Sequence, residues 1–148
     1  MRTIFFDVSR IKTARLFWCL TVASLAAING CAAKVEGPER FQLNGTVTFQ
    51  GKPVPAGEIR FDPDSSKNNS GPGGVADIKA GKYTMRPGMG IVGGPHVVRI
   101  FGYDGQIPAG PEKELQPLGK PIFPTYQTAL ELPKESATQD FDVPATGK

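Results

Sequence analysis

The chain has few of the residues that catalytic and metal centres usually need. Its 148 residues include two cysteines, one histidine and one tryptophan. Two cysteines cannot supply the two Cys-x-x-Cys pairs of a structural zinc site. The histidine, His96, is not accompanied by a Gly-x-Ser-x-Gly motif, which argues against Ser-His-Asp catalysis. We therefore expect no catalytic residues, no cofactor and no resident metal, and we expect His96 to lie at the start of a strand, between core and solvent.

The chain also lacks a run of basic residues and a long hydrophobic segment. Four of the 17 basic residues and one of the 14 acidic residues precede residue 31, so residues 31–148 carry 13 of each. This balance argues against a nucleic-acid partner. The uncharged apolar segment "LFWCLTVASLAAI", residues 16–28, is shorter than the roughly 20 residues of a transmembrane helix.

A basic segment precedes the apolar one and contains Arg2, Arg10, Lys12 and Arg15. A basic segment, an apolar segment of this length and small residues after it are typical of a secretory signal peptide. The alternative is that residues 16–28 form an uncleaved anchor helix. We expect residues 1–30 to be a signal peptide that directs export.

The sequence Ile28-Asn29-Gly30-Cys31 resembles the lipobox of bacterial lipoproteins, although Asn29 departs from the usual small or β-branched residue. The resemblance implies that Cys31 carries a diacylglycerol and becomes the mature N-terminus. Each buried methylene contributes about 0.8 kcal/mol, so two or three acyl chains hold a protein firmly at a membrane. Ala32 after the cysteine resembles an outer-membrane sorting signal, if the cell is Gram-negative. The expected partner is therefore a membrane, reached through lipid on Cys31.

The rest of the chain predicts one all-β domain after a short tether. Residues 31–40 are polar and contain Gly37-Pro38, which indicates the tether. Residues 41–148 contain alternating apolar and polar segments separated by glycine- and proline-rich turns, typical of half-buried strands. We expect a seven-stranded antiparallel Greek-key sandwich, with a single helical turn within residues 110–119. The expected strands lie within residues 41–50, 58–62, 74–79, 81–86, 96–104, 123–132 and 138–143.

Several segments of this domain resemble the carboxypeptidase regulatory-like, or transthyretin-like, family. They are "LNGTVTFQGKPVPAGE", "GKYTMRPG" and "GGPHVVRI", followed by "PTYQTALELPKESATQDFDV", which resembles the last hairpin of small envelope lipoproteins. The resemblance implies a transthyretin-like sandwich. It implies no particular activity, because such domains serve as accessory or interaction modules.

Three further patterns suggest ligand sites only weakly. The glycine pattern "GMGIVG" at residues 88–93 precedes a strand rather than a helix, so it does not predict dinucleotide binding. Asp62 and Asp64 have the alternate spacing of a calcium loop, but the loop lacks its glycine and glutamate. Tyr103 and Phe123 lie in or beside loops and are the aromatic residues expected to be exposed, where their rings would bind a sugar.

These observations favour a non-enzymatic envelope lipoprotein that acts as a structural or protein-interaction module. Besides the membrane, the partner expected is another protein of the cell envelope. The alternative is a ligand-binding module of the cell surface, which would bind a glycan or calcium through the loops at residues 62–74 and 104–120.

Overall fold

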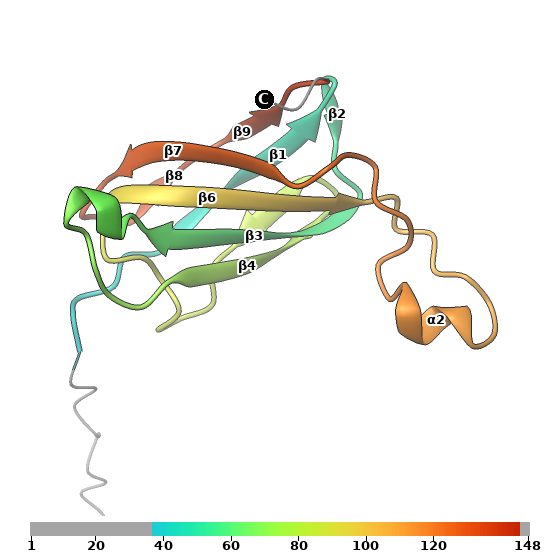
Figure 1. Ribbon diagram of the computed structural model, residues 1–148, viewed down its shortest axis with the longest axis horizontal. Helices are drawn as coiled ribbons and strands as arrows, with labels where there is room; N and C mark the ends of the chain where they lie inside the picture. The colour runs from blue at the N-terminus through green and yellow to red at the C-terminus, as the bar shows by residue number, and fades with distance from the viewer. Residues whose placement is uncertain (1–36, 146–148) are drawn as a thin grey trace, which may run out of the picture. The chain divides into compact units, whose positions relative to one another are not determined.

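The computed structural model describes residues 37–145, which form an all-β domain (Figure 1). The expected signal peptide, the segment that resembles a lipobox and Cys31 lie outside the described residues. Within the described part of the chain, no helix is long and apolar enough to cross a membrane. The elements are β1 (Leu43–Phe49), β2 (Lys52–Pro53), β3 (Ala56–Pro63), the 3-10 helix η2 (Ser65–Lys67), β4 (Gly74–Lys79), β5 (Lys82–Thr84), β6 (Gly94–Tyr103), α2 (Glu112–Leu115), β7 (Tyr126–Leu132), β8 (Ala137–Thr138) and β9 (Phe141–Val143).

The strands form one mixed, mainly antiparallel sheet in the order β2-β1-β5-β4-β3-β6-β7. Strands β8 and β9 lie outside this path, because both pair with β1. The sheet curls into a half-barrel, with β3, β4, β6 and β7 in front of β1, β8 and β9 in the view of Figure 1. The all-β prediction is confirmed, and α2 lies where the sequence predicted a helical turn.

The core consists of the apolar positions that the alternating pattern assigned to one face. On β3, Ile59 and Phe61 are fully buried, and on β6 the same holds for Val98 and Ile100. Strand side chains alternate between the faces of a sheet, so a period of two is enough to place these residues inside. The buried apolar residues are Leu43, Val47, Val54, Ile59, Phe61, Ala76, Ile78, Tyr83, Met85, Ile91, Val98, Ile100, Phe123, Leu132, Phe141 and Val143.

The β4–β5 hairpin shows how local sequence determines a turn. Ala80 and Gly81 connect the two strands with φ of 49° and 75°. Positive φ at both central residues is the geometry that matches the right-handed twist of the flanking strands. The turn brings Tyr83 and Met85 to the core face, where both are buried.

The last strands differ from the prediction. Val47 pairs with Phe141 and Leu43 with Ala137, and both pairings are parallel, so the sheet is mixed rather than purely antiparallel. The expected last hairpin is therefore wrong: within residues 37–145, β7 pairs with β6 and not with β8 or β9. The turn after β7 moves the chain across the domain instead of folding it back beside β7. The alternating pattern of residues 138–143 was correct, since Phe141 and Val143 are buried.

Candidate interaction site

Arg40 fixes the beginning of the domain, although the sequence placed it in the tether. Its guanidinium donates three hydrogen bonds to backbone carbonyls: to Gly90 at 2.9 Å, Gly88 at 2.8 Å and Gly73 at 2.7 Å. The next residue, Phe41, exchanges two backbone hydrogen bonds with Ile91 at 2.8 and 2.9 Å. Arg40 and Phe41 therefore belong to the folded domain, and "GMGIVG" supplies most of the backbone groups that bind them.

The loop at residues 104–121 projects from the opposite end of the sheet and contains α2 (Figure 1). Its two ends are held together by Asp104, whose Oδ1 accepts hydrogen bonds from the backbone N–H groups of Gln106 and Lys120, both at 2.9 Å. Gly119 has a φ of 87°, and a Cβ there would lie 2.0 Å from Asp104 Oδ1. This closed base holds the loop away from the core.

The same loop carries exposed apolar side chains. Leu115 is 82% exposed, Ile107 is 54% exposed and Leu118 is 39% exposed. Clustered exposed apolar residues are typical of interaction sites, whereas single ones are common on any surface. Leu115 and Leu118 line a hollow of about 530 Å³, together with Tyr103, Gln116, Pro117, Gly119, Lys120 and Pro121.

Two features of this hollow bear on what it could bind. The Oε1 atom of Gln116 is buried and has no hydrogen-bond partner among the described residues, so a donor from a ligand could satisfy it. Acidic residues slightly outnumber basic ones along the loop, which contains Asp104, Glu112 and Glu114 against Lys113 and Lys120. The loop therefore lacks the positive charge that attracts anionic lipid.

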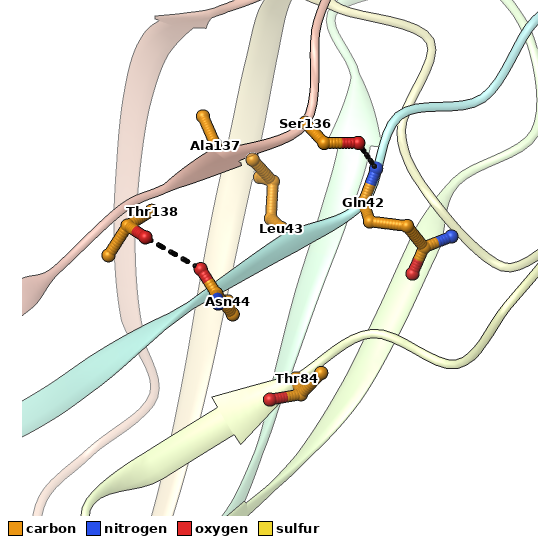
Figure 2. A pocket seen from close by; sticks show the side chains of 7 residues that line it. All are labelled: Gln42, Leu43, Asn44, Thr84, Ser136, Ala137 and Thr138. Carbon is orange, nitrogen blue, oxygen red and sulfur yellow. Dashed lines mark hydrogen bonds between the residues drawn. The ribbon is translucent and has the colours of Figure 1, made fainter.

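A second hollow, of about 340 Å³, lies where β1 meets β5 and β8 (Figure 2). Four of its lining residues are already joined in two hydrogen-bonded pairs. Ser136 Oγ accepts from the Gln42 backbone N–H at 3.1 Å, and Thr138 Oγ1 donates to Asn44 Oδ1 at 2.8 Å. Leu43, Thr84 and Ala137 complete the lining. We interpret this hollow as part of the β1–β8 pairing rather than as a ligand site.

Further hydrogen bonds along β1 join residues that are also 94 positions apart. Asp140 Oδ1 accepts from both the backbone N–H and the hydroxyl of Thr46, at 2.7 and 2.8 Å, and Asp142 Oδ1 accepts from the Thr48 hydroxyl at 2.5 Å. The hydrogen bonds from the Thr46 side chain and then its backbone lower the pKa of Asp140. These contacts fix the parallel register, and sequence analysis missed them because their partners are 94 residues apart.

His96 is buried rather than placed between core and solvent. It is 1% exposed, and its Nδ1 lies 2.8 Å from the Gly94 carbonyl oxygen. Its Nε2 has no hydrogen-bond partner among the described residues. The alternating pattern is consistent with this burial, because residue 96 lies on the same face of the strand as the core residues Val98 and Ile100. Within residues 37–145, no hydroxyl or thiol forms a hydrogen bond with the imidazole.

The two aspartates of the weak calcium pattern are bound to other side chains. Asp62 forms an ion pair with Arg99 across β3 and β6. Asp64 accepts from the Ser66 hydroxyl at 2.5 Å and from its backbone N–H at 3.1 Å, and these bonds lower the pKa of Asp64. No group of three or more His, Cys, Asp or Glu side chains suited to a metal occurs within residues 37–145.

The two aromatics suggested for sugar binding have different surroundings. Phe123 is a core residue at 8% exposure and packs against Phe49, with ring centroids 4.9 Å apart. The prediction of an exposed Phe123 is therefore wrong, because the loop turns inward at this residue. Tyr103 lines the hollow beside α2 and remains half-buried.

Comparison with known proteins adds no family assignment. No protein-family model matches the chain, and no curated protein matches it significantly.

Proposed function

We propose that this protein is an exported lipoprotein whose β-domain is a non-enzymatic interaction module, held at a membrane through lipid on Cys31. Supporting the anchor are the basic and apolar segments before Ile28-Asn29-Gly30-Cys31. Export places the domain in the envelope, at the outer membrane if the cell is Gram-negative. We also propose that the domain is a transthyretin-like Greek-key sandwich of the carboxypeptidase regulatory-like family, on the motifs given above.

One structural observation carries the interaction role. The two ends of the sheet differ. At one end Arg40, near the start of the domain, binds backbone carbonyls, and at the other end lie the exposed side chains of Leu115 and Leu118. A chain tethered before residue 40 would present the 104–121 loop away from its attachment. The low positive charge of the loop favours a protein partner over the lipid surface.

The anchor is tested by intact mass and membrane partitioning of the full-length protein. We expect a mature chain that begins at Cys31, carries diacyl or triacyl mass and partitions into membranes. Cys31→Ser should abolish both the lipid mass and the partitioning. Cys19→Ser is the matched control, because that cysteine lies within the expected signal peptide. A chain with an intact N-terminus and no lipid would contradict the proposal and make residues 16–28 an anchor helix.

The interaction role is tested by site-specific photo-cross-linking in the expressing cell. A cross-linking residue in place of Leu115 should give a discrete adduct with one envelope protein. The control is the same residue in place of Val75, which is 39% exposed on β4, away from the loop. Equal adducts from both positions, or none from either, would contradict a partner site at the loop. Calcium and glycan binding to the purified protein test the alternative.

A further inference from the structure

The strand β7 has an unpaired edge. It pairs with β6 on one side, and within residues 37–145 no other strand pairs with it. Figure 1 shows β7 at the border of the front strands, with its other side open. Its alternate residues Tyr126, Thr128 and Leu130 face inward but are only half-buried. An uncovered edge with a partly covered inner face is a template for one more strand.

The direction of the backbone groups on β7 follows from Pro95. Pro95 has no N–H, and its carbonyl oxygen accepts from the Asp64 backbone N–H at 2.9 Å, on the β3 side of β6. The residue paired with it, Glu131, therefore turns its N–H and C=O away from β6. Backbone direction alternates along an antiparallel strand. Gln127, Ala129 and Glu131 thus present their N–H and C=O groups at the open edge.

We propose that the occupant of this edge is the β7 strand of a second copy of the chain, paired antiparallel about a two-fold axis at Ala129. Ala129 is the middle residue of Tyr126–Leu132, so this register alone pairs all seven residues. It places Ala129 opposite itself and Gln127 opposite Glu131 of the copy. The three residues whose backbone groups face the open edge then lie opposite the same three residues of the copy. Each of these pairs exchanges two N–H···O bonds.

The side chains of β7 match in the same register. Glu131 lies opposite the copy's Gln127, and Gln127 Oε1 already accepts from Arg99 Nε at 3.1 Å in the next strand. Carboxylate, amide and guanidinium therefore form a row across three strands, and the two-fold axis produces this row twice. A parallel pairing through the same edge would instead turn the copy over, so that its inward-facing residues would lie on the exposed face of the sheet.

The inner face is complementary as well. The half-buried Tyr126 lies opposite the copy's Leu132, and Thr128 lies opposite the copy's Leu130. Cross-strand pairs of aromatic, branched and aliphatic residues are favourable on a sheet. Pro124 and Pro133 flank the strand and limit the pairing to this segment. The proposed dimer does not depend on the lipid anchor or on the 104–121 loop.

Disulfide cross-linking of the full-length protein tests both the dimer and its register. In the proposed pair the two Ala129 Cα atoms lie about 5.5 Å apart, within reach of a disulfide. Ala129→Cys should form a covalent homodimer under mild oxidation. Glu131→Cys is the matched control, because the two residues 131 would lie about 13 Å apart along the strands and should cross-link at least ~tenfold less. The double variant Gln127→Cys/Glu131→Cys should restore the covalent homodimer.

The wild-type chain, with its native cysteines, provides the background for these reactions. The proposal would be overturned if Ala129→Cys gave no homodimer above that background, if Glu131→Cys cross-linked equally, or if Ala129→Cys joined a different protein instead.

Sedimentation of the detergent-solubilised full-length protein provides an independent measurement. Ala129→Pro removes an N–H that faces the open edge and leaves the β6–β7 hydrogen bonds in place, so the dimer dissociation constant should rise at least ~tenfold. Ala129→Thr keeps the N–H and should remain dimeric. Circular dichroism checks that both variants fold. A wild-type protein that stays monomeric at high micromolar concentration would contradict the proposal.

Discussion

Strands β1 and β7 have the same length and the same alternating pattern, but their surroundings differ. β1 is paired on both sides, with β5 and β2 antiparallel and with β8 and β9 parallel. β7 is paired on one side, with β6. The inward residues Leu43 and Val47 of β1 are fully buried, whereas Tyr126, Thr128 and Leu130 of β7 are half-buried.

The comparison shows that the same strand pattern can serve two purposes. On β1, the side chains of Asn44, Thr46 and Thr48 form hydrogen bonds with β8, β9 or the segment between them, so the polar face of β1 specifies the register. On β7, Gln127 and Glu131 are exposed, and their backbone groups face solvent or a partner. Three predictions test how far this difference extends.

The largest expected effect is the loss of core packing on β1. Leu43→Ala should lower the free energy of unfolding by about 3 kcal/mol, because a fully buried leucine leaves a cavity. Leu130→Ala on β7 should cost about 1 kcal/mol in the isolated chain, since that side chain is half-exposed. Urea denaturation measures both. Equal losses would show that the two strands are equally covered, which would contradict the open edge.

A smaller effect is expected from the close approach at Gly45. A Cβ there would lie 2.1 Å from the Gln139 carbonyl oxygen, which also accepts from the Tyr83 hydroxyl at 2.6 Å. Gly45→Ala should therefore lower the free energy of unfolding by about 2 kcal/mol, because the segment between β8 and β9 must move. Gly37→Ala, which adds a Cβ with nothing within 4 Å, should change it by less than about 0.5 kcal/mol. A neutral Gly45→Ala would indicate that β1 and the segment before β9 are farther apart.

The smallest expected effect is a change in stability at acidic pH. The pKa of Asp140 is lowered in the folded state, so its contribution to stability is present above the unfolded pKa, about 3.9, and is lost as pH falls toward the folded value. Asp140→Asn should flatten the decrease in melting temperature below about pH 4. Thr46→Val should flatten it less, because the Thr46 backbone N–H still donates to the carboxylate. Melting curves from pH 6 to pH 2 measure this, and identical curves for all three proteins would contradict the contact.

Several structural features were predictable because they depend on neighbouring residues. Alternation along residues 58–62 puts Ile59 and Phe61 on one face, which is the core face, and the boundary expected between the strands at 74–79 and 81–86 coincides with the Ala80-Gly81 turn. The burial of His96 was predictable from the same alternation, because residue 96 shares a face with core residues. Its polar ring instead suggested a position between core and solvent. Tyr83 lies in the strand expected within residues 81–86, and its burial raises the pKa of its hydroxyl.

The arrangement around β1 was not predictable in the same way. Nothing near residues 137–143 indicates that they pair parallel to a strand 94 residues earlier, and a hairpin with β7 fits the local pattern equally well. The three carbonyl contacts of Arg40 also come from segments 33 to 50 residues away. Phe123 lies in a loop, and loop composition does not reveal that the ring turns inward to pack on Phe49.

The sequence by itself determined which side chains of each strand face the core and where the chain turns, because these properties follow from a period of two and from glycine and proline chemistry. The tertiary structure decided which strands are neighbours, the parallel register of β8 and β9, and which edge remains open. The physical reason is that alternation assigns a face to each residue but leaves the partner strand undetermined, and partners are selected by packing and hydrogen bonds between distant segments.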